Sequence, residues 1–486
     1  MKHTHGLSAL TCLLGLALSG CSGSSGEDTG NRGSGGGTRA PSFGGQGASA
    51  GLGGGRSSVL AGGTSATGGT SATGGTSATG GTSATGGTSA TGGTSATGGT
   101  SAIDCSGIVG QDVFVDPAKG NDEGAGTRAA PFKTIDHATV AASKNCSKSI
   151  FLLDGTYNPA SEPKFGGVAA GCGQSSGISI PSGVAIKAVN PGAAKLVIGG
   201  THGLCVAGNS SVSGLSISRA TRGGRVLEAT TGVLDVDSVQ FEGCGSPGVA
   251  GVVTTLQSVS PVQACVVASG DATVRLTASA SHAWLSGAVG TFAAGRDQAR
   301  VSMEGGQLAV APQTDPVAVF VAAERARLSL STLTLSSSDN NAIAVQSQDM
   351  ATVNLTKTTL NGFGMGCLVH TGGSEVVLED VNAASTSKFV YVLERQTSRS
   401  AVTLRRVKVT GGAGAVVVHS GDVALHIAES EMSSCTSGIV YNGTGELDLT
   451  NTRLVNNENG LLAQTTAGPY SVRLRGVEIS GNAKVG

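Results

Sequence analysis

The chain has 486 residues, of which 79 are glycine, 13% are charged and 3% are aromatic, and its formal net charge is −1. An ordinary globular domain has about 25% charged residues and about 7% glycine. This composition excludes a coiled coil, the missing basic excess excludes a nucleic-acid partner, and no apolar run reaches the roughly 20 residues of a membrane-spanning helix. Low-complexity sequence, repetitive β structure, or both remain.

An export signal occupies residues 1–20. A short basic start precedes an apolar run at 7–18, which is too short to span a membrane. The following Leu18-Ser19-Gly20-Cys21 resembles the lipobox of bacterial lipoproteins, which implies a lipoprotein signal peptide, lipid on Cys21 and a membrane partner through this anchor. By analogy with enterobacterial sorting, Ser22 favours the outer membrane of the cell envelope. A plain secretory signal with a chance cysteine is the alternative.

Residues 21–103 form a linker that begins at the lipidated cysteine. It has 28 glycines in the 82 positions after Cys21, and seven hexamers of the type GGTSAT begin at Gly62. Such a segment has too little apolar surface to offset the entropy of ordering. It predicts a disordered tether with an r.m.s. span of about 50 Å. Glycosylated hydroxyls or contacts with a cell-wall polymer are the alternative.

A motif-rich stretch opens the folded part. Residues 113–136 read VFVDPAKGNDEGAGTRAAPFKTID, and residues 150–157 read IFLLDGTY. The pattern resembles the N-terminal module of right-handed parallel β-helix proteins of the pectin-lyase-like superfamily, a domain of unknown function. The resemblance implies an N-terminal cap module at 104–177 with one short helix after Pro131-Phe132, and it implies polysaccharide lyases or glycosidases as the enzymes of the class.

Repeats in the C-terminal half predict the same architecture independently. Apolar residues recur in pairs two positions apart, usually with a third about five positions later, and successive units lie 23, 26, 23, 22 and 25 residues apart. Runs with period two are strands with one buried face. We therefore predict an all-β, right-handed parallel β-helix over 178–486, with about a dozen coils of roughly 22–27 residues. The repeating positions are Val353/Leu355/Leu360, Val376/Leu378, Val402/Leu404/Val409, Leu425/Ile427/Met432, Leu447/Leu449/Leu454 and Val472/Leu474/Ile479.

The same register predicts which ionisable side chains point outward. His426, Asp448 and Arg473 fall in consecutive coils, and Glu379 falls beside Arg405. A lyase that acts on acidic sugars needs a cation for the carboxylate and a base for the α-proton, so these five residues are candidate catalytic groups. The alternative is a solvated ladder of opposite charges, whose pairs contribute about 0.2–1 kcal/mol.

Other catalytic motifs are missing or lack their context. Of the polygalacturonase patterns, only R-x-K is matched, by Arg406-Val407-Lys408. The G-x-S-x-G at 173–177 is followed by a β-type run instead of the helix that a nucleophile elbow requires. The sequence therefore requires no cofactor.

One loop near the start of the folded part is rich in oxygen ligands. It contains Asp116, Asn121, Asp122 and Glu123, which could bind calcium. A capping loop held by Asx turns is the alternative.

Eight cysteines follow Cys21. Local disulfides between Cys105 and Cys146, Cys172 and Cys205, and Cys244 and Cys265 suit an oxidising compartment. Cys367 and Cys435 lie three coils apart, about 14 Å, which exceeds the ~7 Å limit on the Cα separation of a disulfide. We expect those two to be small buried hydrophobic residues.

Two classes of function remain. The first is a surface-anchored lipoprotein that presents a β-helix for glycan or envelope binding, adhesion or structural display. This class is not enzymatic, and the sequence favours it. The second is a polysaccharide lyase or glycoside hydrolase, which rests on analogy of fold. The sequence does not determine the oligomeric state.

Overall fold

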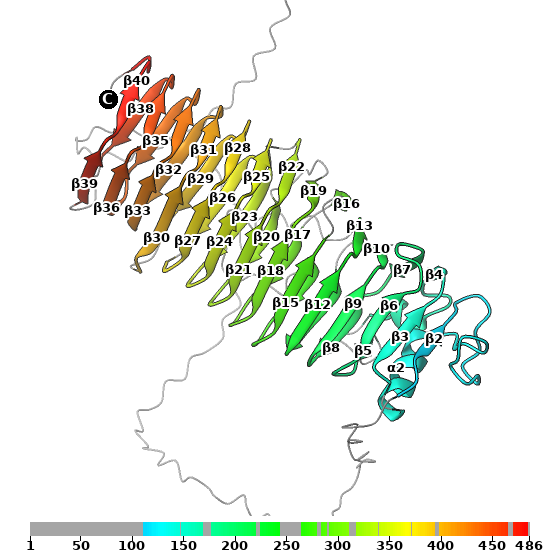
Figure 1. Ribbon diagram of the computed structural model, residues 1–486. Coiled ribbons are helices and arrows are strands. Elements are labelled where there is room, and N and C mark those ends of the chain that lie inside the picture. The colour runs from blue at the N-terminus through cyan, green and yellow to red at the C-terminus, as the bar shows by residue number, and fades with distance from the viewer. Residues whose placement is uncertain are drawn as a thin grey trace, which may run out of the picture. The chain divides into compact units, whose positions relative to one another are not determined.

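The computed structural model describes residues 110–145, 147–168, 176–219, 224–243, 264–278, 283–288, 291–310, 317–338, 340–370, 372–393, 398–464 and 470–484. Their strands form three parallel sheets that run the length of the fold (Figure 1). Each coil adds one strand to each sheet in turn, so the architecture is a parallel β-helix, as the repeats predict. The twelve strands of the third sheet match the predicted dozen coils.

The first sheet carries the outward positions of interest and has 14 strands. They are β2 (Val113–Val115), β3 (Ser149–Leu152), β6 (Ala185–Ala188), β9 (Ser210–Ser213), β12 (Val233–Asp237), β15 (Thr273–Thr277), β18 (Arg300–Glu304), β21 (Arg327–Ser331), β24 (Thr352–Thr356), β27 (Glu375–Glu379), β30 (Ser400–Arg405), β33 (Asp422–Ala428), β36 (Thr444–Thr450) and β39 (Tyr470–Arg475).

The second sheet has 13 strands, most of them short. They are β4 (Gly155–Tyr157), β7 (Ala194–Ile198), β10 (Ser216–Arg219), β13 (Gln240–Glu242), β16 (Ala283–Ala288), β19 (Gln307–Val310), β22 (Thr334–Ser337), β25 (Thr359–Asn361), β28 (Asn382–Ala384), β31 (Lys408–Thr410), β34 (Glu431–Ser433), β37 (Arg453–Val455) and β40 (Glu478–Ser480).

The third sheet has 12 strands and closes each coil. They are β5 (Ile178–Ile180), β8 (His202–Ala207), β11 (Arg225–Thr231), β14 (Ala264–Ala268), β17 (Thr291–Gly295), β20 (Val317–Ala322), β23 (Ala342–Gln348), β26 (Met365–His370), β29 (Lys388–Leu393), β32 (Gly414–Ser420), β35 (Ser437–Tyr441) and β38 (Asn459–Ala463).

Like residues stack from coil to coil inside the helix. In β24, Val353 and Leu355 are buried, and Val353 pairs with Val376 of the next coil. Phe292 lies edge-on between Phe241 and Phe320, with ring centroids 5.4 Å and 5.8 Å apart, and all three rings are buried. This column of apolar side chains is the core, and it holds the outward residues of the sheets in fixed register.

A left-handed residue marks the corner between the first and second sheets in ten coils, with φ between +49° and +74°. Glycine tolerates this conformation, whereas a residue with a side chain pays roughly 1–2 kcal/mol. Most of these corners nevertheless carry side chains, so packing between coils overrides local preference there. The corner residues are Gly214, Ser238, Gly305, Thr332, Lys357, Asp380, Arg406, Glu429, Asn451 and Gly476.

Asparagine amides, of which that of Asn457 is buried, link coils at the corner between the second and third sheets. The Asn457 side chain accepts from the Cys435 backbone N–H at 2.9 Å and donates to the Met432 carbonyl at 3.0 Å. Asn482 repeats the pattern one coil later, with 2.8 Å to the Asn457 N–H and 2.9 Å to the Leu454 carbonyl. Backbone groups that the corner would leave unpaired are thereby satisfied.

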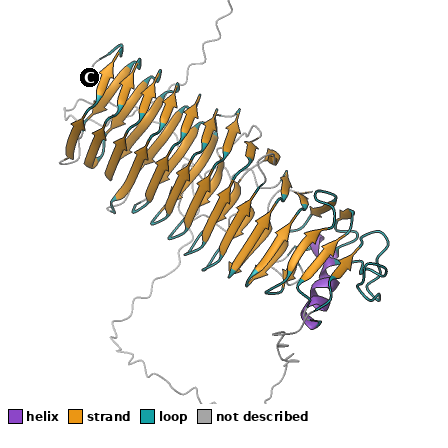
Figure 2. Cartoon of the chain, in the orientation of Figure 1, coloured by secondary structure: helices purple, strands orange, loops and turns teal. Residues whose placement is uncertain are grey.

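The N-terminal module is part of the β-helix and is not a separate domain. Strands β2 and β3 extend the first sheet and β4 extends the second. Helix α2 (Ile135–Lys144) follows Pro131-Phe132 as predicted, and Figure 2 shows it against this end of the strands. A 3-10 turn, η3 (Pro163–Gly166), follows β4. Among the described helices, none is long and apolar enough to cross a membrane.

Glu162 caps helix α2 from within the fold. One carboxylate oxygen accepts from the backbone N–H of Ile135 at 2.6 Å and of Asp136 at 3.3 Å, and the residue is buried. Burial raises the pKa of this carboxyl to about 7. The folded state therefore binds a proton that the unfolded state releases near pH 4.5, and stability falls as the pH rises from there to about 7.

Glu162→Gln should remove this pH dependence, because glutamine keeps an oxygen acceptor and cannot ionise. We expect the variant to be more stable than the wild type above pH 7, by about 3 kcal/mol at most. Denaturant unfolding at pH 5 and pH 8 measures the effect, with Glu123→Gln, on the exposed surface of the same module, as the control. Equal pH slopes in the wild type and Glu162→Gln would contradict it.

Candidate binding site on the first sheet

The outward positions predicted from the repeats are neighbours in the first sheet. His426 in β33 pairs with Asp448 in β36, and Asp448 pairs with Arg473 in β39. In two earlier strands of the same sheet, Glu379 in β27 pairs with Arg405 in β30. The backbone ladder thus brings together the groups that the sequence placed in consecutive coils.

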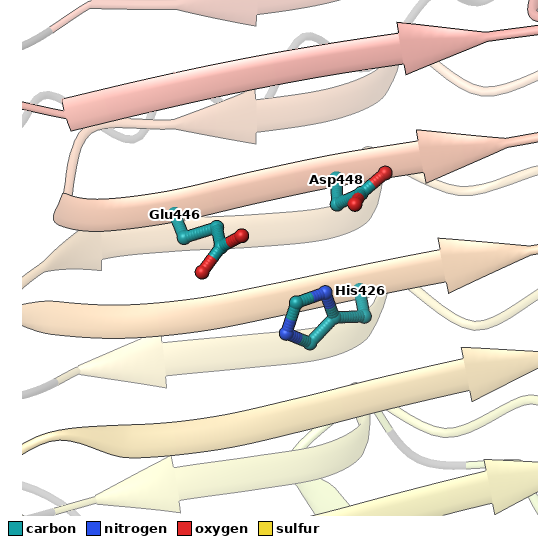
Figure 3. A group of neighbouring side chains, drawn as sticks. All are labelled: His426, Glu446 and Asp448. Atoms are coloured by element: carbon teal, nitrogen blue, oxygen red, sulfur yellow. The ribbon is translucent and has the colours of Figure 1, made fainter.

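Glu446 completes a compact group with His426 and Asp448, which Figure 3 shows on two adjacent strands. Glu446 and Asp448 lie two residues apart in β36, so strand alternation points both carboxylates to the outer face. One ligand atom from each of the three residues lies within 4.8 Å of the others, and all three side chains are half-buried. In the described part of the chain, no other group of His, Cys, Asp and Glu meets this condition.

Three arginines surround the two carboxylates. Glu446 forms ion pairs with Arg473 and, at 3.2 Å, with Arg399. Asp448 pairs with Arg475, whose Nη2 lies 2.8 Å and 3.1 Å from its two oxygens. Arg473 therefore reaches Glu446, although its backbone register partner is Asp448. The three arginine side chains are exposed to solvent.

A second ionic cluster lies one to two coils earlier. Arg405 lies 3.5 Å from Glu379, as the register predicts, but Arg406 binds more tightly, at 2.5 Å from Glu379 and 2.7 Å from Asp380. The hydrogen bond from Arg406 lowers the pKa of the Asp380 carboxyl. Glu429 adds two longer contacts of 3.9 Å, one to each arginine. Ion pairs at this exposure contribute about 0–1 kcal/mol each.

A shallow groove of about 400 Å³ follows the corner beside this cluster. Arg406, Glu429 and Asn451, the left-handed residues of three coils, line it together with polar side chains of the second sheet, Lys408, Glu431 and Arg453. Arg453 bridges Glu431 and Glu478 across the groove wall. The surface thus offers donors and acceptors in rows at the spacing of strands, about 4.8 Å.

The geometry suits binding along an open surface more than bond cleavage. Glycosidases place two carboxyl groups on either side of the scissile bond. Here Glu446 and Asp448 lie on one strand and on one side of any bound chain. Both are paired with arginines, Glu446 with Arg399 and Arg473, and Asp448 with Arg475. The histidine with two carboxylates does offer the ligand set of a metal ion.

Three of the predicted calcium ligands accept hydrogen bonds from protein groups through their side-chain oxygens. Asp116 accepts from two backbone N–H groups at 2.8 Å and 3.0 Å, and Asn121 accepts from Glu123 at 3.2 Å. The Asp122 carboxylate accepts hydrogen bonds from the backbone N–H groups of Lys133 and Thr134. It also accepts one from the Thr134 hydroxyl, which caps helix α2. These are Asx-type turn and capping contacts, and the calcium site stays a prediction.

The cysteine predictions are met in part by described residues. Cys367 and Cys435 are buried free thiols, as expected, and burial raises the pKa of Cys435 to about 11. Cys205 and Cys265 lie in β8 and β14 and are not among the free thiols. Cys21, Cys105, Cys146, Cys172 and Cys244 lie outside the described residues, so lipidation and the disulfide pairings stay predictions.

Sequence reasoning missed Glu446, Arg399 and Arg475. A signal existed for two of them, because Glu446 and Arg475 lie two positions from Asp448 and Arg473 and so share their outward face. Arg399 precedes β30 and reaches Glu446 two coils away, which the repeat pattern does not encode.

Comparison with known proteins finds one family model that matches part of the chain. Residues 118–271 match the model of a protein family of unknown function, DUF1565. With three parallel sheets wound around one core, the class is decided. The chain carries a parallel β-helix domain. A comparison with curated proteins finds no match for it.

Three solved structures match this chain at low sequence identity. The catalytic domain of a GH87 α-1,3-glucanase with tetrasaccharides is 11% identical, with 72% of this chain and 67% of that one covered and a TM-score of 0.43. The A-module of mannuronan C-5 epimerase AlgE4 from Azotobacter vinelandii is 12% identical, with 76% and 97% covered and a TM-score of 0.38. A GH136 lacto-N-biosidase from Eubacterium ramulus is 8% identical, with 76% and 68% covered and a TM-score of 0.34.

Proposed function

We propose that this protein is a lipid-anchored lipoprotein of the outer membrane that displays a parallel β-helix and binds a polysaccharide of the cell envelope. The bound chain lies on the outer face of the first sheet across β30, β33, β36 and β39. Cys21 supplies the anchor, and residues 22–103 supply the tether. The role is binding, and no covalent step is part of it.

The observation that carries this proposal is the row of exposed arginines over the last coils. Arg399, Arg473 and Arg475 converge on the Glu446–Asp448 pair, and their side chains are 49%, 56% and 64% exposed. Planar guanidinium groups bind carboxylates in bidentate fashion. An acidic polysaccharide fits this row best, because its carboxylates can share the arginines and its hydroxyls can donate to Glu446 and Asp448.

A polysaccharide lyase is the second candidate, and one observation favours it. His426 in β33 lies on the same sheet as Arg473 and Arg475 of β39, with β36 between them, so a base and cations share one face. A lyase needs both. The open surface and the arginine-paired carboxylates are the reasons for ranking it second.

Binding is tested with the secreted full chain carrying Cys21→Ser, against a panel of acidic and neutral polysaccharides in affinity electrophoresis and calorimetry. Arg473→Ala should weaken binding of an acidic polysaccharide about tenfold, because a hydrogen bond to a charged group is worth roughly 1.5 kcal/mol or more. Arg275→Ala is the matched control. Arg275 lies on the same sheet in β15, pairs with Asp235 at 3.4 Å, and has the same side-chain exposure as Arg473, 56%.

Turnover is measured on the same panel. Unsaturated product is followed by ultraviolet absorbance, and new reducing ends are followed chemically. Steady product formation that disappears in His426→Ala would replace the binding proposal with the lyase. Failure of every polysaccharide to bind, or equal losses in Arg473→Ala and Arg275→Ala, would reject a glycan site across β30, β33, β36 and β39.

A further inference from the structure

We propose that His426, Glu446 and Asp448 form a binding site for one divalent transition-metal ion, with zinc as the ion that suits it best. The site lies on the same face as the proposed polysaccharide surface, but it does not depend on polysaccharide binding. One imidazole nitrogen and one oxygen from each carboxylate are the ligands, and water completes the coordination.

Backbone register already places the three ligands. His426 and Asp448 are direct partners across β33 and β36, and Glu446 lies two residues before Asp448 on the same face. Their donor atoms lie within 4.8 Å of one another. Ligand bonds of about 2.0–2.2 Å bring donor atoms to about 3.0–3.5 Å apart. Rotation of the side chains covers the difference, so no strand has to move.

The ligand set decides the class of metal. Calcium takes six to eight oxygen ligands, and magnesium keeps several waters around one or two carboxylates. An imidazole with two carboxylates instead suits zinc and the other late first-row ions. Three protein ligands also leave coordination positions open, as in zinc sites that accept water or a further ligand.

Arginine is the competitor of the metal at this site. Arg473 and Arg399 form ion pairs with the Glu446 carboxylate, and Arg475 forms an ion pair with that of Asp448. These exposed pairs are weak and their long side chains can turn to solvent. Removal of Arg473 therefore leaves Arg399 as the one arginine paired with Glu446 and removes a repelling positive charge. The metal affinity should rise in Arg473→Ala, whereas the affinity for an acidic polysaccharide should fall.

The test is calorimetric titration of the secreted full chain, freed of metal and of affinity tags, with Zn²⁺ in the absence of polysaccharide. Co²⁺ serves as a second probe, because its visible absorption reports coordination by the imidazole. We expect one ion per chain, a loss of at least tenfold in affinity for His426→Ala and for Asp448→Asn, and a gain of severalfold for Arg473→Ala. His419→Ala, which removes an exposed histidine from β32, should leave the affinity unchanged.

Any of three results would reject the proposed metal site. They are the absence of a single stoichiometric site, equal affinity in His426→Ala and the wild type, and weaker metal binding in Arg473→Ala. His426→Gln keeps the size and polarity of the side chain, and circular dichroism verifies its fold, so lost binding cannot be assigned to unfolding. Because no polysaccharide is present, a failed glycan assay and a failed metal titration remain separate results.

Discussion

Replacing Cys21 with serine should move the protein from the membrane fraction to the soluble fraction, the largest effect of any single substitution in the chain. Acyl chains contribute about 0.8 kcal/mol per buried methylene, and stable anchoring takes more than one chain. Serine offers no thiol for that lipid. Fractionation of an expressing bacterial host, together with incorporation of labelled palmitate, measures both consequences of the change.

A second cysteine provides the control for the anchor. Cys12 lies within the apolar run of the signal, and Cys12→Ser should leave both the label and the membrane association intact. Cys21→Ser protein that still sediments with membranes and needs detergent for release would show that something other than lipid holds it. An unlabelled wild type would favour the plain secretory signal.

Phe320→Ala should lower the free energy of unfolding by about 3–5 kcal/mol. The ring is fully buried in the middle of the core and packs edge-on against Phe292 with centroids 5.8 Å apart. Removal of a large buried side chain loses its transfer free energy and leaves a cavity. Urea unfolding followed by circular dichroism measures the loss, and hydrogen exchange of β17, β20 and β23 tests whether the damage starts at these coils.

Phe114→Ala is the matched comparison, because Phe114 stacks on Phe151 at 5.4 Å on the half-buried outer side of β2. The loss there should be nearer 1 kcal/mol, since little cavity forms. Similar losses in the two variants, or a loss below 1 kcal/mol for Phe320→Ala, would mean that the coils around Phe320 close over the gap.

The fold was accessible from sequence because its register repeats. Val353, Val376 and Val402 recur at the spacing of one coil and stack as partners in the structure. A parallel ladder converts equal positions in successive coils into neighbours, so His426 and Asp448 could be paired without coordinates. Strand alternation alone determines the face on which such residues lie.

The contacts of long side chains could not be predicted from the repeat pattern. Arg473 and Arg399 reach the same carboxylate from different coils, and the outcome depends on rotamers that no repeat fixes. The corners could not be predicted from it either. Glycine and asparagine are the usual signals of a left-handed residue, but Arg406 and Glu429 hold such positions because the stacked coils impose them.

The direction of the hydrogen-bonded ladders has a mechanical consequence. Neighbouring strands of all three sheets follow one another along the axis of the helix (Figure 1), so their hydrogen bonds run roughly parallel to that axis. A pull between the two ends of the β-helix loads the coil interfaces in series, and each interface bears the whole tension. The molecule should then yield one coil at a time at modest force and lengthen in steps of about one repeat. A protein held at one end and bound at the other would act as an extensible damper.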